Sequence, residues 1–216
     1  QYIGFEQKGK LITFNPKSHV RMFPSFQPEA DGVTFHLKAV YTDTLRNEYS
    51  KEHSTHPIRM SRICGPVEVV NDTTFTVRFY RMGLDNPKRT GGICLMASVK
   101  QDHKYRSAVQ QVEIRIPYRN KEGIPQRIIF PKLSDVKASV KEISLNGTAD
   151  SGLPVYYYVK EGPAEIKGDK LVLTKIPPRA KFPVKVTVVA WQYGRSGEPK
   201  VQTAEAVEQS FYITAR

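Results

Sequence analysis

The side chains best suited to catalysis or metal binding are unevenly spread along this chain of 216 residues. All five histidines lie in its first half: His19, His36, His53, His56 and His103. The closest pair stands in KEHSTHP, where two rings three residues apart could share a metal ion, but no cysteine or carboxylate at metal-ligand spacing accompanies them. We therefore expect a solvated loop there, and the sequence predicts no metal and no other cofactor.

Recognised catalytic motifs are missing from the sequence. It contains no G-x-S-x-G elbow, no H-E-x-x-H helix motif, no phosphate-binding P-loop and no G-x-G-x-x-G. Its aspartates stand mainly in turn sequences, where a carboxylate bonds to the local backbone. The chain is predicted not to be an enzyme, and a hydrolase built around its histidines is the least favoured alternative.

Four aromatic residues of the second half could form a ligand-binding face. The apolar pattern of the strand places Ala190 on the face that packs on the core. Trp191 is the next residue, so its indole should lie on the opposite face. There it would approach Tyr156 or Tyr158, with Tyr193 at the rim. An exposed aromatic strip can stack on sugar rings. The blander alternative, which we favour, is that Trp191 is buried in the core or packs against a neighbouring module.

Basic residues recur in the connections that precede two apolar segments. These are Arg78, Arg81, Lys88 and Arg89 in the first half, and Arg179, Lys181 and Lys185 in the second. Arginine can bind a carboxylate or a sulfate through two hydrogen bonds, so the connections could bind acidic polysaccharide. Such charges more commonly only keep loops solvated. Aromatic and basic residues do not alternate in a binding pattern, so nucleic acid is not expected as a partner.

The net charge of +12 is evenly distributed. Residues 1–117 carry 17 Lys and Arg against 11 Asp and Glu, and residues 118–216 carry 16 against 10. An even spread without a basic tail is typical of a soluble surface. No run of about 18 apolar residues is present, so no transmembrane segment is expected.

The elements that position these residues are predicted to be strands. Alternation with a period of two recurs in KLITF, VTFHLKAVY, FTVRFY, VKVTVVAW and VEQSFYI, separated by turn compositions such as KGD and RSGEP. Fifteen prolines and fourteen glycines punctuate the chain, and no segment keeps a helical apolar period. The sequence predicts an all-β protein.

An internal repeat divides the chain. Gly65-Pro66 corresponds to Gly162-Pro163, GICLMAS to VKVTVVAWQ, and SAVQQVEIRI to EAVEQSFYIT through a shared Ala-Val-x-Gln. In the last pair the apolar parity differs by one residue, which indicates either a bulge or a wrong local alignment. We expect two tandem immunoglobulin-like antiparallel β-sandwiches, at 1–117 and 127–216, joined by a polar linker at 118–126.

The second copy resembles the bacterial immunoglobulin-like modules of secreted and cell-surface proteins. The resemblance rests on SGLPV at 151–155, a Gly-x-Ala hairpin at 162–173, Ala-x-Gln at 190–192 and a closing strand at 207–213. The first copy is a diverged version with STHPIRM in place of SGLPV. The resemblance implies a spacer or docking module that contacts other domains or proteins of a cell-surface assembly, with no catalytic motif to transfer.

The same resemblance implies a secreted, periplasmic or cell-surface location. The chain begins with Gln1 rather than Met, so we expect a processed or truncated form whose targeting signal has been removed.

The two cysteines, Cys64 and Cys94, are too few for a disulfide scaffold. Cys64 would end the third strand and Cys94 would begin the sixth, and these strands are antiparallel neighbours in such a sandwich. A bridge would close a loop of about 30 residues and contribute on the order of 3–4 kcal/mol. Two quiet core thiols are the alternative.

Overall fold

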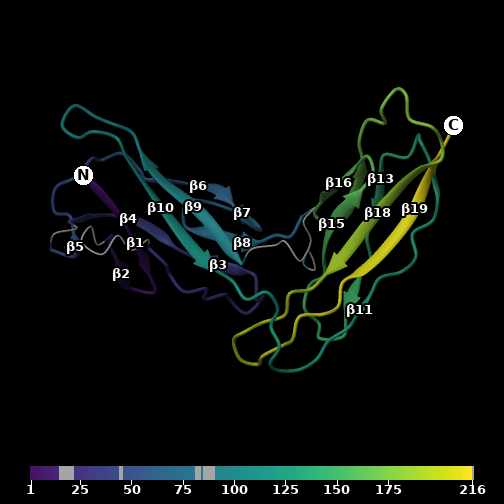
Figure 1. The fold of residues 1–216 in the computed structure, drawn as a ribbon, viewed down its shortest axis with the longest axis horizontal. Helices are drawn as coiled ribbons and strands as arrows, with labels where there is room; N and C mark the ends of the chain where they lie inside the picture. Colours follow the sequence, from purple (N-terminus) through teal and green to yellow (C-terminus); the bar gives the residue numbers. More distant parts are fainter. Residues whose placement is uncertain (15–21, 44–45, 81–83, 85–90, 216) are drawn as a thin grey trace. The chain divides into compact units, whose positions relative to one another are not determined.

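The computed structural model describes residues 1–14, 22–43, 46–80, 84 and 91–215. These residues form nineteen β-strands and no helix, which confirms the all-β class (Figure 1). Within the same ranges, no helix has the length and apolar character needed to cross a membrane.

The chain divides into two compact units whose boundaries differ from those expected from the repeat. Unit 1 comprises Gln1–Arg78 and Thr90–Tyr118, and unit 2 comprises Phe79–Arg89 and Arg119–Arg216. The described residues of the connection after the eighth strand, Phe79, Tyr80 and Leu84, therefore group with unit 2 rather than unit 1. Most of the expected linker at 118–126 is likewise part of unit 2.

Unit 1 is built from three antiparallel sheets. In sheet order their strands are β2 (Lys10–Ile12), β1 (Tyr2–Gln7), β4 (Lys38–Asp43) and β5 (Glu48–Tyr49); β10 (Ala108–Arg115), β9 (Gly92–Val99) and β6 (Arg59–Cys64); and β3 (Thr34–His36), β8 (Thr74–Val77) and β7 (Val67–Val69). Alternate residues of β9, from Ile93 to Val99, are buried, as a strand with one face on the core requires. Phe35 and Phe75 stack in this core with ring centroids 5.5 Å apart.

Unit 2 has the two-sheet arrangement of an immunoglobulin-like sandwich. Its strands, again in sheet order, are β12 (Val136–Lys137), β19 (Val207–Thr214), β18 (Val184–Trp191) and β15 (Tyr156–Glu161); β13 (Glu142–Ser144), β17 (Lys170–Leu173) and β16 (Ala164–Lys167); and the short pair β11 (Ile128–Ile129) and β14 (Thr148–Ala149). Leu171, Val188 and Phe211 come from both main sheets and pack in one core. Figure 1 shows β15, β18 and β19 side by side.

The Gly-Pro pairs take the same conformation in both units. Gly65 has φ +98° and Gly162 has φ +102°, a region that side-chain-bearing residues rarely adopt. A Cβ added at Gly65 would lie 2.4 Å from the carbonyl oxygen of Gly92, and one added at Gly162 would lie 2.7 Å from that of Lys185. The correspondence predicted between the two motifs is therefore confirmed.

A register shift precedes each Gly-Pro pair. In β6 the pairing with β9 becomes irregular just before Cys64, and in β15 the pairing with β18 becomes irregular just before Glu161. Beyond the shift, Cys64 faces Cys94 and Glu161 faces Thr187. The two copies thus share a bulged corner, and they place different side chains at it.

The last strands pair alike in both units. Ile93 faces Ile114 in unit 1, and Val186 faces Phe211 in unit 2, so Ile114 corresponds to Phe211. The parity difference in the sequence therefore comes from a wrong local alignment through the Ala-Val-x-Gln motifs. No bulge is needed in these strands.

Candidate functional site: the aromatic cluster on β18

Trp191 lies at the end of β18 on the face opposite the sandwich core. Val186, Val188 and Ala190 point into the core of unit 2, whereas Val189 and Trp191 alternate with them. The expected orientation of the indole is therefore correct. Its exposure is a different matter, because the side chain is 0% exposed.

Two aromatic rings cover the indole. Phe79 meets it edge to face, with ring centroids 4.8 Å apart and an interplanar angle of 85°. Tyr156, directly across on β15, lies at 4.9 Å and 32°. Edge-to-face and tilted arrangements are the preferred geometries of aromatic pairs. The face that could have stacked on a sugar is occupied by residues of the chain itself.

Tyr193 completes the cluster and is also fully buried. Its ring lies 5.7 Å from that of Phe79. Its carbonyl oxygen accepts hydrogen bonds from Asn120 Nδ2 at 2.9 Å and Thr203 Oγ1 at 2.6 Å. The expected rim position is therefore wrong. The loop after β18 folds back on the chain that enters unit 2, and this encloses Tyr193.

Phe79 was not among the residues expected in this cluster. It follows β8, and the apolar pattern of FTVRFY predicts that the strand continues through it. Instead β8 ends at Val77, and Phe79 is buried in unit 2. No local signal could have shown this, because the strand pattern is the same whichever core receives the ring.

The indole nitrogen has an unusual environment. Trp191 Nε1 is buried and makes no hydrogen bond among the described residues. An unsatisfied buried donor costs about 1–3 kcal/mol. A sugar site needs both an accessible ring face and hydrogen-bond partners, so this position is a packing site in the structure.

Tyr158, the other tyrosine expected near the indole, lies on the same face of β15 as Tyr156 and is half-buried.

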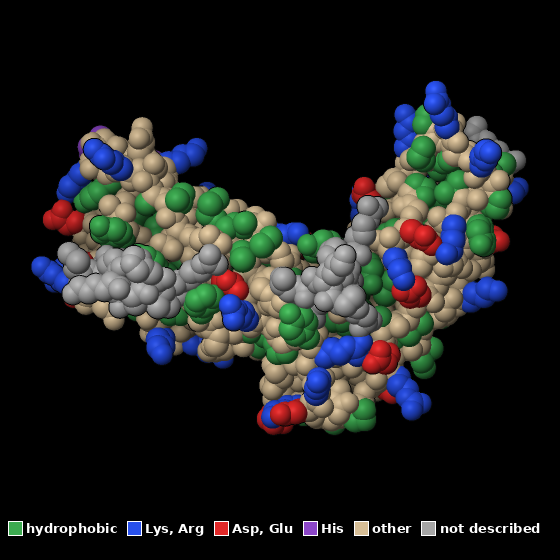
Figure 2. All heavy atoms as spheres, viewed as in Figure 1, with side chains coloured by type: hydrophobic (Ala, Val, Ile, Leu, Met, Phe, Trp, Pro, Cys, Tyr) green, Lys and Arg blue, Asp and Glu red, His purple; other side chains and the backbone are tan. Residues whose placement is uncertain are grey.

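The predicted basic residues that the structure describes lie at separate places. Arg78 belongs to unit 1 and pairs with Glu68 at 3.4 Å. Arg179 and Lys181 are exposed in the connection between β17 and β18. Arg81, Lys88 and Arg89 lie outside the described residues. On the face seen in Figure 2, basic side chains are scattered among acidic and apolar ones, without a single dense block.

The histidines serve separate local roles. His53 stacks on Tyr41 with ring centroids 4.2 Å apart, and its Nδ1 contacts the carbonyl oxygen of Ser54. The backbone nitrogen of His56 donates to the hydroxyl of Ser54. His19 lies outside the described residues, and within the described ranges no three His, Cys, Asp or Glu side chains are placed to hold a metal ion.

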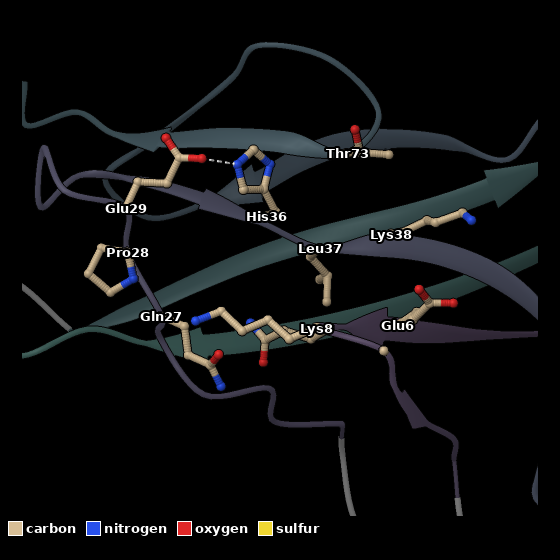
Figure 3. Close-up of a pocket in the computed structure, with 11 residues that line it drawn as sticks. Glu6, Lys8, Gln27, Pro28, Glu29, His36, Leu37, Lys38 and Thr73 are labelled. Atoms are coloured by element: carbon tan, nitrogen blue, oxygen red, sulfur yellow. Dashed lines mark hydrogen bonds and ion pairs between the residues drawn. The ribbon is translucent and has the colours of Figure 1, made fainter. Parts of the chain in front are cut away.

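A hollow of about 530 Å³ lies in unit 1 (Figure 3). Its wall includes the β1–β2 turn, residues 27–29 and the junction of β3 and β4. His36 Nε2 pairs with Glu29 Oε1 at 2.5 Å, and Thr74 Oγ1 lies 3.3 Å from His36 Nδ1. The order carboxylate–imidazole–hydroxyl is that of a hydrolytic triad. Here, however, His36 and Glu29 are each 53% exposed, so water screens their interaction.

Cys64 on β6 and Cys94 on β9 are direct cross-strand partners, and their strands are antiparallel neighbours as predicted. Cys64 is exposed and Cys94 is half-buried, and they are unbridged in the structure. Neither is a core thiol. Cys94 alternates with the buried Ile93 and Leu95, so both cysteines lie on the outer face of their sheet.

No family model matches the chain, and no curated protein matches it. Among solved structures it is similar to domains EC1–2 of human protocadherin-24, with 13% identity over 90% of this chain and 93% of that one and a TM-score of 0.33. It is also similar to EC1–4 of Drosophila N-cadherin, with 10% identity, 90% and 47% coverage and a TM-score of 0.31. For EC22–24 of mouse cadherin-23 the values are 18%, 90%, 62% and 0.29. TM-scores and identities of this size leave function to be argued from the residues of this chain.

Proposed function

We propose that this chain is a non-catalytic structural module that spaces or docks other parts of a secreted or cell-surface bacterial protein. The observation that supports it best is the burial of Trp191 beneath Phe79. The aromatic face that offered a candidate ligand platform is covered by Phe79, a residue of the same unit. Aromatic surface spent on internal packing stabilises a scaffold.

The residues that follow Tyr118 support the same function. Arg119 makes two hydrogen bonds to the carboxylate of Glu205, at 2.7 and 3.1 Å. Lys200 pairs with Glu122 at 2.6 Å. A bidentate arginine–carboxylate pair fixes geometry as well as adding energy. The expected linker is therefore held against unit 2 at several points, as suits a spacer.

The bacterial and extracellular parts of this proposal rest on the resemblance of residues 151–213 to bacterial immunoglobulin-like modules. The partners would be neighbouring domains or proteins of a surface assembly. Binding of acidic polysaccharide is the rival function, and it requires Trp191 or the exposed Arg179 and Lys181 to contact sugar.

A glycan panel that includes sulfated and uronic-acid polysaccharides distinguishes the two functions. Trp191 is the only tryptophan, so its fluorescence reports on the cluster directly. We expect no quenching, no shift in melting temperature and no binding that survives physiological salt, at which exposed charges are screened beyond about 8 Å. Saturable binding at that salt, lost in R179A/K181A, would overturn the spacer function.

A matched pair of variants tests the role of Phe79 in the same assay. Phe79→Ala should expose the indole, and Phe182→Ala removes an exposed ring from the same unit as a control. If Phe79→Ala creates glycan binding that the wild type lacks, Phe79 covers a latent site, and the spacer function is incomplete. If neither variant binds, the cluster is structural.

A further inference from the structure

The cross-strand cysteine pair carries an inference that is independent of the proposed function. Cys64 and Cys94 are direct partners in the antiparallel pairing of β6 and β9. Direct partners on antiparallel strands have Cα atoms about 4.5–5.5 Å apart, and disulfides span Cα separations of about 4.4–6.8 Å. The backbone therefore holds both residues within bridging range.

The two thiols also share one environment on the outer face. They are direct cross-strand partners on the same face of the sheet. Partial burial, followed by the neighbouring Cys64 thiol and the charge of Glu113, raises the pKa of the Cys94 thiol, while Gln111 acts in the opposite direction. Cys64 is exposed, so a reagent from solvent reaches it directly.

We propose that Cys64 and Cys94 form a redox site, a cross-strand disulfide made and broken by exchange with an external small-molecule or protein disulfide. The thiolate of Cys64 attacks one sulfur of the external disulfide and expels the other sulfur as a thiolate. Cys94, after losing its proton, attacks the mixed disulfide at Cys64 and expels the second external thiolate. The two cysteines are oxidised, the external disulfide is reduced to two thiols, and the two cysteine protons pass to these leaving groups.

The corresponding position of unit 2 shows what such a link does. There Thr187 Oγ1 donates to Glu161 Oε1 at 2.7 Å, and Lys185 Nζ pairs with the same carboxylate oxygen at 2.7 Å. Side chains therefore tie the two strands together at the bulged corner. In unit 1 the residue in the place of Lys185 is Gly92, and a disulfide would supply the cross-strand link covalently.

The loop that this disulfide would close is an unusual one. Between the two cysteines run β7, β8 and the connection to β9 that carries Phe79. The bridge would join the chain before this connection to the chain after it. Oxidation would therefore limit the unfolded states of unit 1 and fix both ends of the segment that carries Phe79.

The test uses the full chain, first reduced and then incubated with oxidised glutathione. After alkylation with iodoacetamide, we expect an intact mass with no alkylated cysteine, and tryptic peptides 63–78 and 90–100 joined by a bond that dithiothreitol cleaves. The unfolding transition that Trp191 fluorescence does not report should rise by about 10 °C or more. Two alkylated thiols in the folded, oxidised protein, or disulfide-linked dimers, would overturn the proposal.

A variant that moves one thiol along β6 provides the control. In Cys64→Ser/Ser61→Cys the new thiol lies on the same exposed face, but it faces Met96 rather than Cys94. Diagonal partners are about 7–8 Å apart, beyond the reach of a disulfide. We expect glutathione adducts and no internal bridge. Equal bridging in this variant would show that register does not position the pair. Neither result depends on glycan binding, so this proposal and the proposed function can fail separately.

Discussion

The two units place different chemistry on the same bulged corner. Cys64 faces Cys94 in unit 1, and Glu161 faces Thr187 in unit 2, each directly before a glycine with positive φ. Repeated glycines preserve the backbone path because only their conformation and small size fit it. The facing side chains point away from the hydrophobic core of their unit, so the packing of that core does not restrict their types.

A second difference lies further along the same strands. Ser98 of β9 and Trp191 of β18 occupy corresponding positions, facing Arg59 and Tyr156 respectively. This position of the outer face holds a polar side chain in unit 1, whereas in unit 2 it holds the indole that packs against Phe79. The comparison shows that a repeat fixes the frame of each unit, while the outer face decides whether a further segment can be attached.

The largest expected effect comes from removing the ring that unit 2 receives. Phe79→Ala should lower the free energy of unfolding of unit 2 by about 3–5 kcal/mol, because it leaves a cavity beside Trp191. Trp191 fluorescence should shift to the red, and chemical denaturation monitored at this residue measures the loss. Phe182→Ala, at an exposed position, should change stability by no more than about 0.5 kcal/mol. Equal effects of the two substitutions would argue against the packing role.

Moving the cysteines to the other copy tests whether the corner alone specifies a bridge. In the C64S/C94S background, Glu161→Cys together with Thr187→Cys should form a disulfide that adds about 3 kcal/mol to the stability of unit 2 over the reduced form. Peptide mapping after oxidation detects the bond. Failure to bridge would mean that the two corners differ more than their registers indicate.

The shared glycines should be sensitive in both units. Gly65→Ala and Gly162→Ala each combine a positive φ with a Cβ less than 3 Å from a backbone oxygen, so each should destabilise its own unit by about 2–3 kcal/mol. Gly168→Ala has φ +64° and open space around the added Cβ, and it should cost only about 1 kcal/mol. Urea titration with separate probes for the two units measures the stability of each. Loss of stability in the unit that does not contain the substitution would contradict the prediction.

The smallest expected effect concerns acid. Asp102, in the loop after β9, accepts hydrogen bonds from Ser54 and from the backbone nitrogens of Lys104 and Tyr105, which lower its pKa to about 2. The carboxylate is more acidic in the folded state, so its stabilisation is present above about pH 4 and is lost as the pH falls toward 2. Asp102→Ala should flatten this part of the pH dependence of unit 1. Melting curves from pH 5 to pH 2 provide the measurement, and an unchanged slope would contradict the assignment.

Much of the fold could be predicted because it depends on short-range patterns. Alternating residues predicted β18 and β19, the internal repeat predicted β9, and the Gly-Pro pairs predicted the corners of both copies. The orientation of Trp191 followed from the period of a strand. The alignment of the last strands was wrong by one residue. It matched the four-residue motif Ala-Val-x-Gln, whereas the strand pairing aligns Ile114 with Phe211.

The candidate site could be predicted only in part. Its aromatic members in unit 2 were found from their positions on two neighbouring strands. Phe79, which packs against Trp191 and Tyr193, lies more than a hundred residues away in the sequence. The segment that carries Phe79 was placed in the first sandwich, because the pattern of its strand continues without a break.

The sequence by itself determined the all-β class, the duplication and the faces of the strands, because these follow from local periodicity and from glycine stereochemistry. The tertiary structure alone decided which unit receives Phe79 and therefore that Trp191 is buried. It also decided the register in which Cys64 and Cys94 are direct partners on neighbouring strands. Burial and register arise from contacts between distant segments, and a local pattern is compatible with more than one such contact.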